Sequence, residues 1–490
     1  MEDKTNGALD CAMEATRRGA VLEVGELSFF HRCVDGTWLI VKTLLLAIDL
    51  MLILSRPVRS LFFTCFGGSK RAPRKSQELM CDKKNRAQVV VVGASFAGLE
   101  AVMHLAAHPE EVDVLLVTER PYFEYTPGVL RCLVQPAHFY ELACSLPFSS
   151  TNVLVARAIG METDSSNTSH LKIDLASASP AHTQHERVPF DHCLITVGNV
   201  YTEAVIKPCY AEQTLPHRAA TWQRAHEELR RATSVLVIGG GLVGVELAAE
   251  VAVAMPSIAI TIVHSREELC TELPRAARIY IANWLKEKKV NVQLARRVVE
   301  MSGGHCSPSS PGGHCSLDDA RQCTLDDGSC LSFSLVYQCT GGEGHSNIIS
   351  GFNAEALSAS RYLCTTDTLQ VVGKRNVWAA GDAAVMIAAA AARDSIMAVQ
   401  AAALDSTAGT YALHQRPVKN AHTAEQTAKT AAMNILRCIK GAEVCGYPQD
   451  LAGQGHSLPD IYCVSLGPYD GVIVFNWLVL PGPLAALMKR

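Results

Sequence analysis

The sequence predicts an α/β fold with parallel sheets, because an apolar strand, a glycine-rich turn, a helix and a second apolar strand follow one another in that order twice. The first unit begins with "QVVVVGASFAGLEAVMHLAAH" at 88–108, and the second begins with "SVLVIGGGLVGVELAAE" at 234–250. Uninterrupted apolar strands are typical of parallel sheets that are covered on both faces. The two units therefore predict two Rossmann-like dinucleotide-binding domains.

The composition is typical of a globular intracellular protein with a large core. The chain has 490 residues, of which 48% are hydrophobic and 19% are charged, enough for two or three domains. The net charge of −4 argues against a general nucleic-acid binder, although Lys70–Arg86 is locally basic. None of the 18 cysteines forms a C-x-x-C pair, so we expect reduced thiols and no disulfide framework.

A hydrophobic segment near the N-terminus predicts contact with membrane lipid. Trp38–Leu54 is apolar over 17 residues apart from Lys42 and Asp49, which is close to the lower length limit for spanning a bilayer. A short spanning helix, an in-plane anchor and a buried core helix all fit this segment. The flank that follows is basic, which favours a cytoplasmic position for the rest of the chain. The sequence does not identify the membrane, and a mitochondrial membrane is the alternative.

The first turn has the spacing of a phosphate-binding loop with one change. Gly93 permits the tight turn and Gly98 allows helix and strand to meet closely, but Ser95 stands at the middle glycine position. Phe96 and Ala97 complete the turn at the start of the helix, where free N–H groups bind pyrophosphate in such sites. We expect these five residues to bind a dinucleotide.

An acidic residue at the end of the next strand supports this first site. Dinucleotide sites commonly place a carboxylate about 20 residues beyond the turn, where it binds the adenosine ribose. The strand "VDVLLV" ends at Thr118-Glu119, so Glu119 is the candidate. A surface glutamate beside Arg120 is the alternative interpretation.

The second turn carries all three glycines of the dinucleotide-binding motif. Gly239, Gly241 and Gly244 occupy the motif positions, and Glu246 follows just inside the helix. A carboxylate there either faces a bound cofactor or interacts with the helix dipole. The turn is the stronger of the two nucleotide-binding signals.

The strand after the second helix ends in "IVHSRE", without an acid at its end. His264 and Arg266 stand where NAD-selective sites often carry a carboxylate. Arg266 is a candidate ligand for a 2′-phosphate. The sequence leaves NADH and NADPH both open as the reductant.

Three further apolar strands end in glycine turns. "HCLITVGN" ends at Gly198, "LVYQCTGG" reaches Gly341, and "NVWAAGDAAV" reaches Gly381 and Asp382. We expect all four of these turn residues to contribute to the nucleotide sites.

Two segments have the composition of insertions. Gly303–Ser316 is rich in glycine, serine and proline, and its histidines and cysteines fit no common zinc module, so we expect a loop and no metal site. Ala383–Leu404 is rich in alanine, which predicts a peripheral helix.

In this order, the motifs resemble the oxidoreductases that carry two dinucleotide-binding domains, one for FAD and one for NAD(P)H. The order is G-x-S-x-x-G, T-V-G, G-x-G-x-x-G-x-E, C-T-G and A-G-D. The resemblance implies that the first site holds FAD and that the second binds NADH or NADPH. It also implies that Gly381 and Asp382 contact the flavin ribityl chain and phosphate.

Four segments resemble the apoptosis-inducing-factor homologues of the ferroptosis-suppressor type, with type II NADH dehydrogenases as the next relatives. They are "YFEYTPGVLRCLVQP" (Tyr122–Pro136), "IVHSREEL" (262–269), "KNAHTAEQTAKTAAMNI" (Lys419–Ile435) and "SLGPYDGV" (Ser465–Val472). The resemblance implies that Lys419 lies beside the flavin, and Arg131 is a further candidate cofactor contact. Glu425 and Lys429 replace two glutamines that the type II enzymes carry for the quinone.

The resemblance implies a discontinuous FAD domain into which the NAD(P)H domain is inserted. The predicted regions are an N-terminal region 1–86 with the hydrophobic helix 38–54 and a basic linker, the first FAD-binding part 87–205, the NAD(P)H-binding domain 206–333 with an insertion at 302–330, the second FAD-binding part 334–447 with an alanine-rich insertion at 383–418, and a membrane-proximal region 448–490.

The resemblance implies an oxidoreductase in which NAD(P)H reduces the flavin. Lys419 would stabilise charge on the reduced flavin, and Glu246 would face the junction of nicotinamide and flavin. The stretch after the first unit holds only Cys132 and Cys144, which are too far apart in sequence for a dithiol motif. Together with the hydrophobic segment, this favours a membrane quinone as the electron acceptor.

Two other functions fit the same sequence. One is a soluble NAD(P)H-dependent reductase of a one-electron carrier protein, and the other is a signalling flavoprotein that senses NAD(P)H and turns over slowly. Neither requires the hydrophobic N-terminal segment. We expect no nucleic-acid partner, and the sequence predicts no oligomeric state.

Overall fold

The computed structural model describes a large part of one compact unit, residues 63–490. The described residues are 86–146, 152–175, 185–201, 203, 205–208, 212–302, 321–345, 356–358, 360–387, 419–447 and 461–489. The hydrophobic segment Trp38–Leu54 lies outside them, as does the basic linker up to residue 85. Within these ranges, no helix combines the length and the apolar character needed to cross a bilayer.

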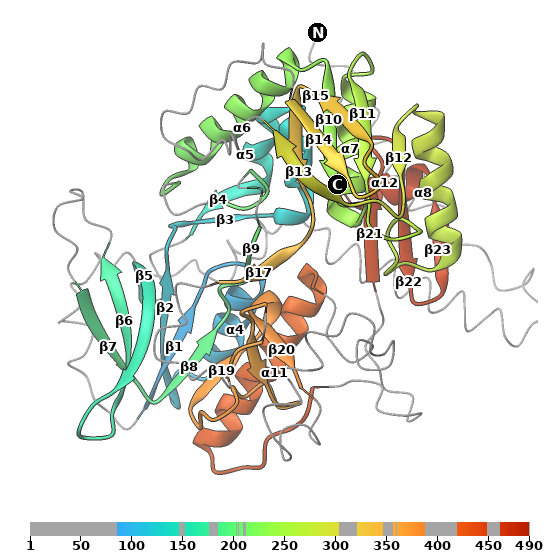
Figure 1. Cartoon of the computed structure of the whole chain (residues 1–490). Coiled ribbons are helices and arrows are strands. Elements are labelled where there is room, and N and C mark those ends of the chain that lie inside the picture. Colours follow the sequence, from blue (N-terminus) through green and yellow to red (C-terminus); the bar gives the residue numbers. More distant parts are fainter. Residues whose placement is uncertain are drawn as a thin grey trace, which may run out of the picture. The chain divides into compact units, whose positions relative to one another are not determined.

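The first of two large sheets has seven strands in the order β19-β8-β1-β2-β5-β6-β7 (Figure 1). The strands from β19 to β5 run parallel, whereas β6 pairs antiparallel with both β5 and β7. Because β19 follows β8 by more than 180 residues, this sheet is discontinuous in sequence. Its strands are β1 Ala87–Val92, β2 Val112–Thr118, β5 Asn152–Thr163, β6 Ser169–Leu175, β7 His185–Phe190, β8 His192–Ile195 and β19 Val377–Ala379.

Helices α4 (Phe96–Ala106) and α11 (Ala421–Ile439) pack against each other and against this sheet (Figure 1). Asn420 is the N-cap of helix α11, and its side-chain oxygen accepts a hydrogen bond from the Thr423 N–H at 2.8 Å. The face of α11 that is buried consists largely of small residues, which let the two helices approach closely. These residues include Ala424, Ala428, Ala431 and Ala432.

The second large sheet has four parallel strands in the order β12-β11-β10-β16. Helix α7 runs from the glycine-rich turn after β10 and is buried along most of its length, as expected for a helix that is apolar on all sides. The elements of this part are α6 Leu215–Arg231, β10 Ser234–Ile238, α7 Leu242–Ala254, β11 Ala259–Val263, α8 Arg275–Glu287, β12 Asn291–Gln293 and β16 Leu335–Gln338.

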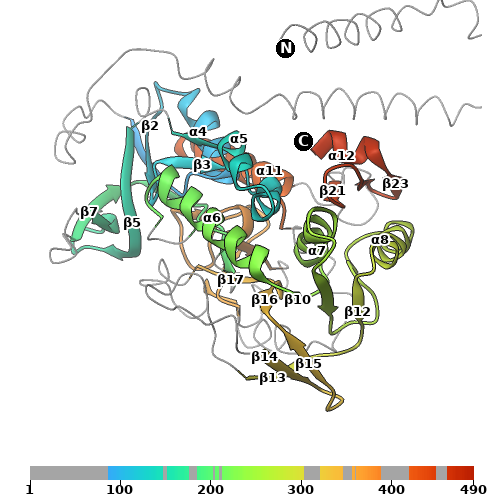
Figure 2. The same cartoon turned by 90° about the horizontal axis from the view of Figure 1, so that it is seen from above.

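Smaller sheets complete the described residues. The C-terminal sheet β21-β22-β23 and helix α12 lie beside α7 and α8, as Figure 2 shows from above. Their bounds are β21 Ile461–Ser465, β22 Gly471–Phe475, β23 Leu478–Pro481 and α12 Pro483–Lys489. The other short elements are β3 Tyr122–Glu124, η4 Thr126–Leu133, η5 Pro136–His138, α5 Phe139–Leu142, β4 Ala143–Ser145, β9 Asn199–Tyr201, β13 Val298–Ser302, β14 Arg321–Leu325, β15 Cys330–Phe333, β17 Gly342–Gly344, β18 Leu363–Thr365, η8 Gly381–Ala383 and β20 Ala384–Met386.

The structure confirms the two predicted strand–turn–helix–strand units. The first unit forms β1, α4 and β2, and the second forms β10, α7 and β11. The strands of the first unit lie in the seven-stranded sheet and those of the second in the four-stranded sheet. The three apolar runs that lead to Gly198, Gly341 and Gly381 form β8, β16 and β19. The predicted loop Gly303–Ser316 lies outside the described residues.

The predicted helix over Ala383–Leu404 is wrong at its beginning. Ala384–Met386 form the buried strand β20, which pairs in parallel with β18. Burial and sheet hydrogen bonds outweigh the helix propensity of alanine at these positions. The rest of that segment, from residue 388 onward, lies outside the described residues.

A buried ion network joins helix α6 to strand β3. Arg218 on α6 is fully buried, and its guanidinium donates to both oxygens of Glu124 on β3 at 2.9 and 3.0 Å. It also donates to Glu212 at 3.4 Å and to the Val205 carbonyl at 2.8 Å. The Trp222 ring lies 4.6 Å from the guanidinium carbon. The network satisfies charges that would otherwise be costly to bury.

We predict that Arg218→Met lowers the free energy of unfolding by about 3–5 kcal/mol, because the change leaves two buried carboxylates without their cation. Urea denaturation followed by circular dichroism measures the difference. The matched control is Arg224→Met, which removes an exposed arginine from the same helix and should change stability by less than about 1 kcal/mol. Equal effects of the two substitutions would contradict this role of Arg218.

Candidate functional site

The turn after β1 leaves no room for a side chain at its first and last glycines. Gly93 has a φ of +106°, and a Cβ atom there would lie 2.7 Å from the Thr196 carbonyl oxygen. A Cβ atom at Gly98 would lie 1.7 Å from the Gly93 carbonyl oxygen. Ser95 is exposed and precedes α4 without a capping hydrogen bond from its side chain. The N-terminus of α4 therefore has the form of a phosphate-binding turn.

The turn at Gly381 lies directly beside this first turn. A Cβ atom at Gly381 would lie 3.0 Å from the Cβ of Ala97, and the Gly381 N–H donates to Thr427 Oγ1 on α11 at 2.9 Å. On the other side of α4, the ring of Phe96 packs edge-on against Phe123, with 5.3 Å between the ring centroids. The structure thus brings together the turn residues that the sequence predicted for the first site.

Lys207, a partly buried lysine that was not predicted as a site residue, contacts this group. Lys207 lies 3.4 Å from the Asp382 carboxylate, donates to the side-chain oxygen of Asn199, and stands over the Tyr201 ring. Burial lowers the pKa of Lys207, although Asp382 favours its charged form. Gly198, with a φ of +72°, lies next to the same ammonium group. The region combines a cation, a carboxylate and a strained backbone turn at the edge of the first sheet.

Glu119 lies at the end of β2, where the sequence predicted it. Its two carboxylate oxygens pair with Arg157 at 3.5 Å and with Arg120 at 3.4 Å. The Glu119 side chain is 18% exposed, so one face of the carboxylate remains accessible. Binding of a ribose by Glu119 stays a prediction, and so does the alternative of a surface glutamate beside Arg120, with which Glu119 forms an ion pair.

The second turn repeats the geometry of the first. Gly239 has a φ of +111°, and a Cβ atom there would lie 2.4 Å from the Cys339 carbonyl oxygen. A Cβ atom at Gly244 would lie 1.9 Å from the Gly239 carbonyl oxygen. Gly241 precedes α7 and faces open space, since the nearest atom to a Cβ there is Glu272 Oε1 at 3.9 Å. Both turns therefore have the same form around the N-terminus of a buried helix.

A cavity of about 550 Å³ lies over the second turn. Its wall comes from the turn itself, from the ends of β11 and β16, and from the residues that follow β12. The lining includes Gly239, Gly241, His264, Arg266, Thr271, Glu272, Arg296, Arg297, Cys339, Gly341, Tyr201 and Lys419. The volume and the polar groups are those of a small-molecule site.

Lys419 links the first group of turns to this cavity. Its ammonium donates to the Asp382 carbonyl oxygen at 2.6 Å and to the Ala384 carbonyl at 3.4 Å. The same ammonium lies 3.8 Å from the centroid of the Tyr362 ring. Because Lys419 also lines the cavity over the second turn, one charged side chain contacts both predicted sites.

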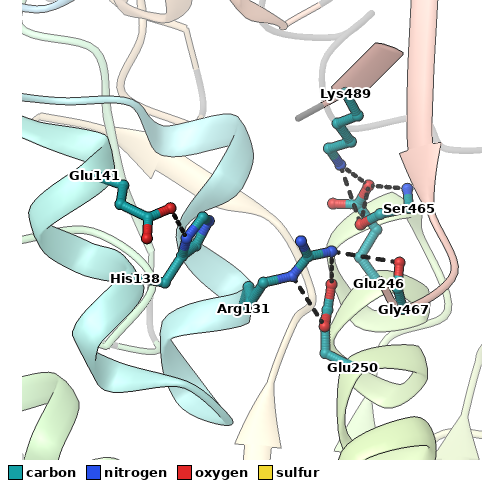
Figure 3. Close-up of polar contacts among 8 residues, drawn as sticks. All are labelled: Arg131, His138, Glu141, Glu246, Glu250, Ser465, Gly467 and Lys489. Atoms are coloured by element: carbon teal, nitrogen blue, oxygen red, sulfur yellow. Dashed lines mark hydrogen bonds and ion pairs between the residues drawn. The ribbon is translucent and has the colours of Figure 1, made fainter. Parts of the chain in front are cut away.

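Glu246 and Glu250 lie on one face of α7, and each is held by a cation from another part of the chain (Figure 3). Glu246 accepts a hydrogen bond from the Ser465 N–H at 2.7 Å and pairs with Lys489 on α12. Arg131 on η4 donates to Glu250 at 3.0 Å and to the Gly467 carbonyl at 3.4 Å. These contacts tie η4 and the C-terminal sheet to α7.

The contacts of Arg131 and Glu246 bear on their predicted roles. Arg131 contacts Glu250 and Gly467, so this arginine links η4 to α7 and to the turn after β21. Contact of Arg131 with a cofactor and a position of Glu246 at the nicotinamide stay predictions. The partners Glu250 and Lys489 were missed, although the spacing of Glu250 four residues after Glu246 indicates a shared helix face.

Glu425 on helix α11 is a titratable group near the first turn. Burial, with a smaller contribution from Glu100, raises the pKa of Glu425 to about 7. Burial likewise raises the pKa of Tyr125 to about 12, and the charge of Glu425 adds to this shift. The ring of Tyr125 packs against Phe96, 5.6 Å between centroids. Glu425 thus holds a proton near neutral pH at one side of the first turn.

Comparison with known proteins is consistent with this geometry. Residues 87–406 match the family model described as pyridine nucleotide-disulphide oxidoreductase. Ferroptosis suppressor protein 1 of Xenopus tropicalis is 26% identical over 301 residues, which cover 61% of this chain and 74% of that protein. The family resemblance inferred from the motifs is confirmed.

Solved structures share the fold at low sequence identity. NDH2 from Plasmodium falciparum in complex with NADH matches with a TM-score of 0.57 at 13% identity, over 82% of this chain and 93% of that chain. The sulfide:quinone oxidoreductase of Aquifex aeolicus matches with a TM-score of 0.57 at 15% identity, over 82% and 89%. At these identities the likeness shows the fold alone.

We predict that Glu425→Gln changes how stability depends on pH. In the unfolded chain a glutamate loses its proton near pH 4.5, whereas in the folded chain Glu425 keeps it until about pH 7. The wild type therefore loses stability relative to Glu425→Gln as the pH rises through this window, by an amount on the order of 2 kcal/mol. Urea denaturation at pH 5 and pH 7.5 measures the difference, and the exposed Glu443→Gln is the control. A pH-independent difference would contradict the raised pKa.

Proposed function

We propose that this chain, which belongs to the pyridine nucleotide-disulphide oxidoreductase family, passes electrons from NAD(P)H through FAD to a membrane quinone. Members of this family are flavoproteins that bind FAD and use NAD(P)H, and the chain is an oxidoreductase of this kind. The proposal adds which turn holds which nucleotide, which residues contact them and which acceptor receives the electrons. The observation that carries it is the position of Lys419, which contacts the Asp382 turn and also lines the cavity over the second turn.

We assign FAD to the turn after β1. The turn at Gly93 and Gly98 can close against the Thr196 and Gly93 carbonyls only because neither residue carries a side chain, and the Gly381 turn lies beside it. This close turn leaves the N-terminus of α4 free for a pyrophosphate. Asp382 and Lys207 would hold the ribityl and phosphate groups, and Glu119 the adenosine ribose. When bound, the flavin supplies the redox chemistry. In this assignment the FAD domain comprises 87–205 and 334–447, with 206–333 inserted between them.

We assign NAD(P)H to the cavity over the second turn. The N-terminus of α7 at Gly241 is open toward the cavity, which suits a pyrophosphate. Lys419 would place a positive charge between the two nucleotides, where it stabilises negative charge that develops on the flavin side. Glu246, buried near the start of α7, would face the nicotinamide, with Lys489 holding its carboxylate in place.

The described cysteines favour direct transfer to an external acceptor. A dithiol relay needs two neighbouring sulfurs, but the sequence holds no pair of cysteines at C-x-x-C or C-x-x-x-x-C spacing. Burial raises the pKa of Cys132, the cysteine of η4, to about 12, so this thiol is a poor nucleophile at neutral pH. The sequence places Cys144 twelve residues further on. A quinone accepts electrons from a reduced flavin without any thiol.

The membrane side of the proposal has two supports. The apolar segment Trp38–Leu54 has the composition of a lipid anchor. In the C-terminal part, Tyr469, Trp477 and Leu484 are large apolar side chains that are more than half exposed. We propose that these elements hold the enzyme at a membrane, with the two nucleotide sites on its cytoplasmic side.

We predict opposite effects for matched substitutions at the starts of α4 and α7. Ser95 and Gly241 both precede their helix in an extended backbone conformation and face open space, so the fold tolerates a larger residue at either position. Ser95→Val should give a folded, colourless protein. Gly241→Val should stay yellow but resist bleaching by NAD(P)H. Visible spectra and circular dichroism of both variants decide the assignment, and the reverse pattern of flavin loss would exchange the two sites.

We predict that the acceptor is a quinone and that no cysteine relays electrons to it. Cys132→Ala and Cys144→Ser should each keep NAD(P)H-dependent reduction of a water-soluble quinone within a few-fold of the wild-type rate. A thousandfold loss would correspond to about 4 kcal/mol of activation barrier and would reveal a redox thiol. The same assay with a small disulfide in place of the quinone serves as the control. Turnover of the disulfide but not of the quinone would contradict the proposed function.

A further inference from the structure

The end of β11 lacks the carboxylate that binds the adenosine ribose of NADH in many sites of this form. The strand ends at Val263, and His264, Ser265 and Arg266 follow it along the wall of the cavity. The one glutamate that lines the cavity, Glu272, lies near the pyrophosphate turn, with Oε1 3.9 Å from the position of a Cβ on Gly241. Among the described residues that line the cavity, none that follows β11 at the ribose end carries a carboxylate.

His264 fixes the backbone of the turn at this end of the cavity. Its Nδ1 accepts a hydrogen bond from the Gly240 N–H at 3.1 Å, so the neutral ring carries its proton on Nε2. Burial and the nearby Arg266 lower the pKa of His264, which keeps the ring neutral. Because Nε2 is buried, the ring holds the turn in place and this nitrogen does not itself face the open cavity.

The backbone gathers three arginines at the same place. The Ala295 N–H donates to the Arg266 carbonyl at 2.9 Å, and the Arg296 N–H donates to the His264 carbonyl at 3.0 Å. These two bonds hold the segment after β12 beside the end of β11. Arg266, Arg296 and Arg297 consequently all line the cavity.

Among the described residues, two of these arginines form no ion pair with a carboxylate. Arg296 pairs with Asp327 at 2.7 Å. Arg266 donates to the hydroxyl of Thr271, and Arg297 is exposed. Asp326 accepts a hydrogen bond from the Arg297 backbone N–H, which fixes the backbone and leaves the guanidinium group available. The described residues at this end of the cavity therefore carry a net positive charge.

We propose that this cavity selects NADPH over NADH, with Arg266 and Arg297 binding the 2′-phosphate. The inference rests on the proposed assignment of NAD(P)H to this cavity. A phosphate monoester carries a charge of about −1.5 to −2 at neutral pH and presents three acceptor oxygens. Guanidinium groups bind such groups with paired, charge-assisted hydrogen bonds.

The test compares two adenosine nucleotides that differ only in the 2′-phosphate, and it requires no turnover. Adenosine 2′,5′-bisphosphate and adenosine 5′-monophosphate are titrated by calorimetry into the full-length, flavin-loaded protein. We expect the bisphosphate to bind at least about tenfold more tightly, as charge-assisted hydrogen bonds of this kind imply. Arg266→Ala and Arg297→Ala should each remove most of this preference and leave affinity for the monophosphate within about twofold.

Three further variants test the source of this preference. Arg266→Lys keeps the charge but loses the paired donors, so it should restore part of the preference that Arg266→Ala removes. The control Arg230→Ala removes an exposed arginine of α6 that does not line the cavity, and it should leave the preference unchanged. Ser265→Asp adds a carboxylate at the strand end and should shift the preference toward the monophosphate.

The outcomes separate the two proposals. Equal binding of the two nucleotides to the wild type, or a preference that survives both alanine substitutions, would overturn the selection of NADPH and leave the quinone proposal standing. Failure of quinone turnover with the bisphosphate preference intact would overturn the acceptor and support the selection. Binding of neither nucleotide would overturn the assignment of this cavity and, with it, the selection.

Discussion

The structure depends on two contacts in which a backbone carbonyl oxygen leaves no room for a side chain. The Thr196 carbonyl closes over Gly93, and the Cys339 carbonyl closes over Gly239, in both cases at a positive φ that favours glycine. In each turn, the last glycine also lacks a side chain, so the helix that follows can pack against the carbonyl of the first glycine. Each contact aims the N-terminus of a buried helix at open space, and the candidate sites form around these two helix ends.

The two turns serve one reaction only if they are connected, and the connections come from remote parts of the chain. Lys419 joins the Asp382 turn to the second cavity, while Arg131 and Lys489 attach η4 and the C-terminal helix to the carboxylates of α7. The Arg218 network adds a buried connection between α6 and β3. Since most of these links are charged and at least partly buried, they favour one arrangement of the parts over others.

The sequence was sufficient for the units that follow local rules. Apolar strands, glycine turns and helix starts are short-range patterns, so β1, α4, β10 and α7 could be predicted with their turns. The discontinuous first sheet followed from the order of the motifs. The strand β20 could not be predicted, because its alanines favour a helix until the pairing with β18 is known.

Contacts between residues far apart in the chain could not be predicted from the sequence either. Nothing local to Lys207 indicates that Asp382, 175 residues away, will face it, and nothing near Arg131 indicates Glu250. Arg266 was predicted from its place after a strand, but Arg297 reaches the same wall only through backbone bonds across β11 and β12. Such pairs become visible only when packing brings distant segments together.

The central claim is that two nucleotides at these two turns exchange electrons and pass them to a quinone without a thiol. The most direct measurement is an anaerobic titration of the purified full-length protein with NADPH, followed in the visible spectrum, with a water-soluble quinone added at the end. We expect yellow protein whose flavin absorption bleaches with NADPH and returns with the quinone. Protein without flavin absorption, or bleached protein that only a disulfide reoxidises, would contradict it.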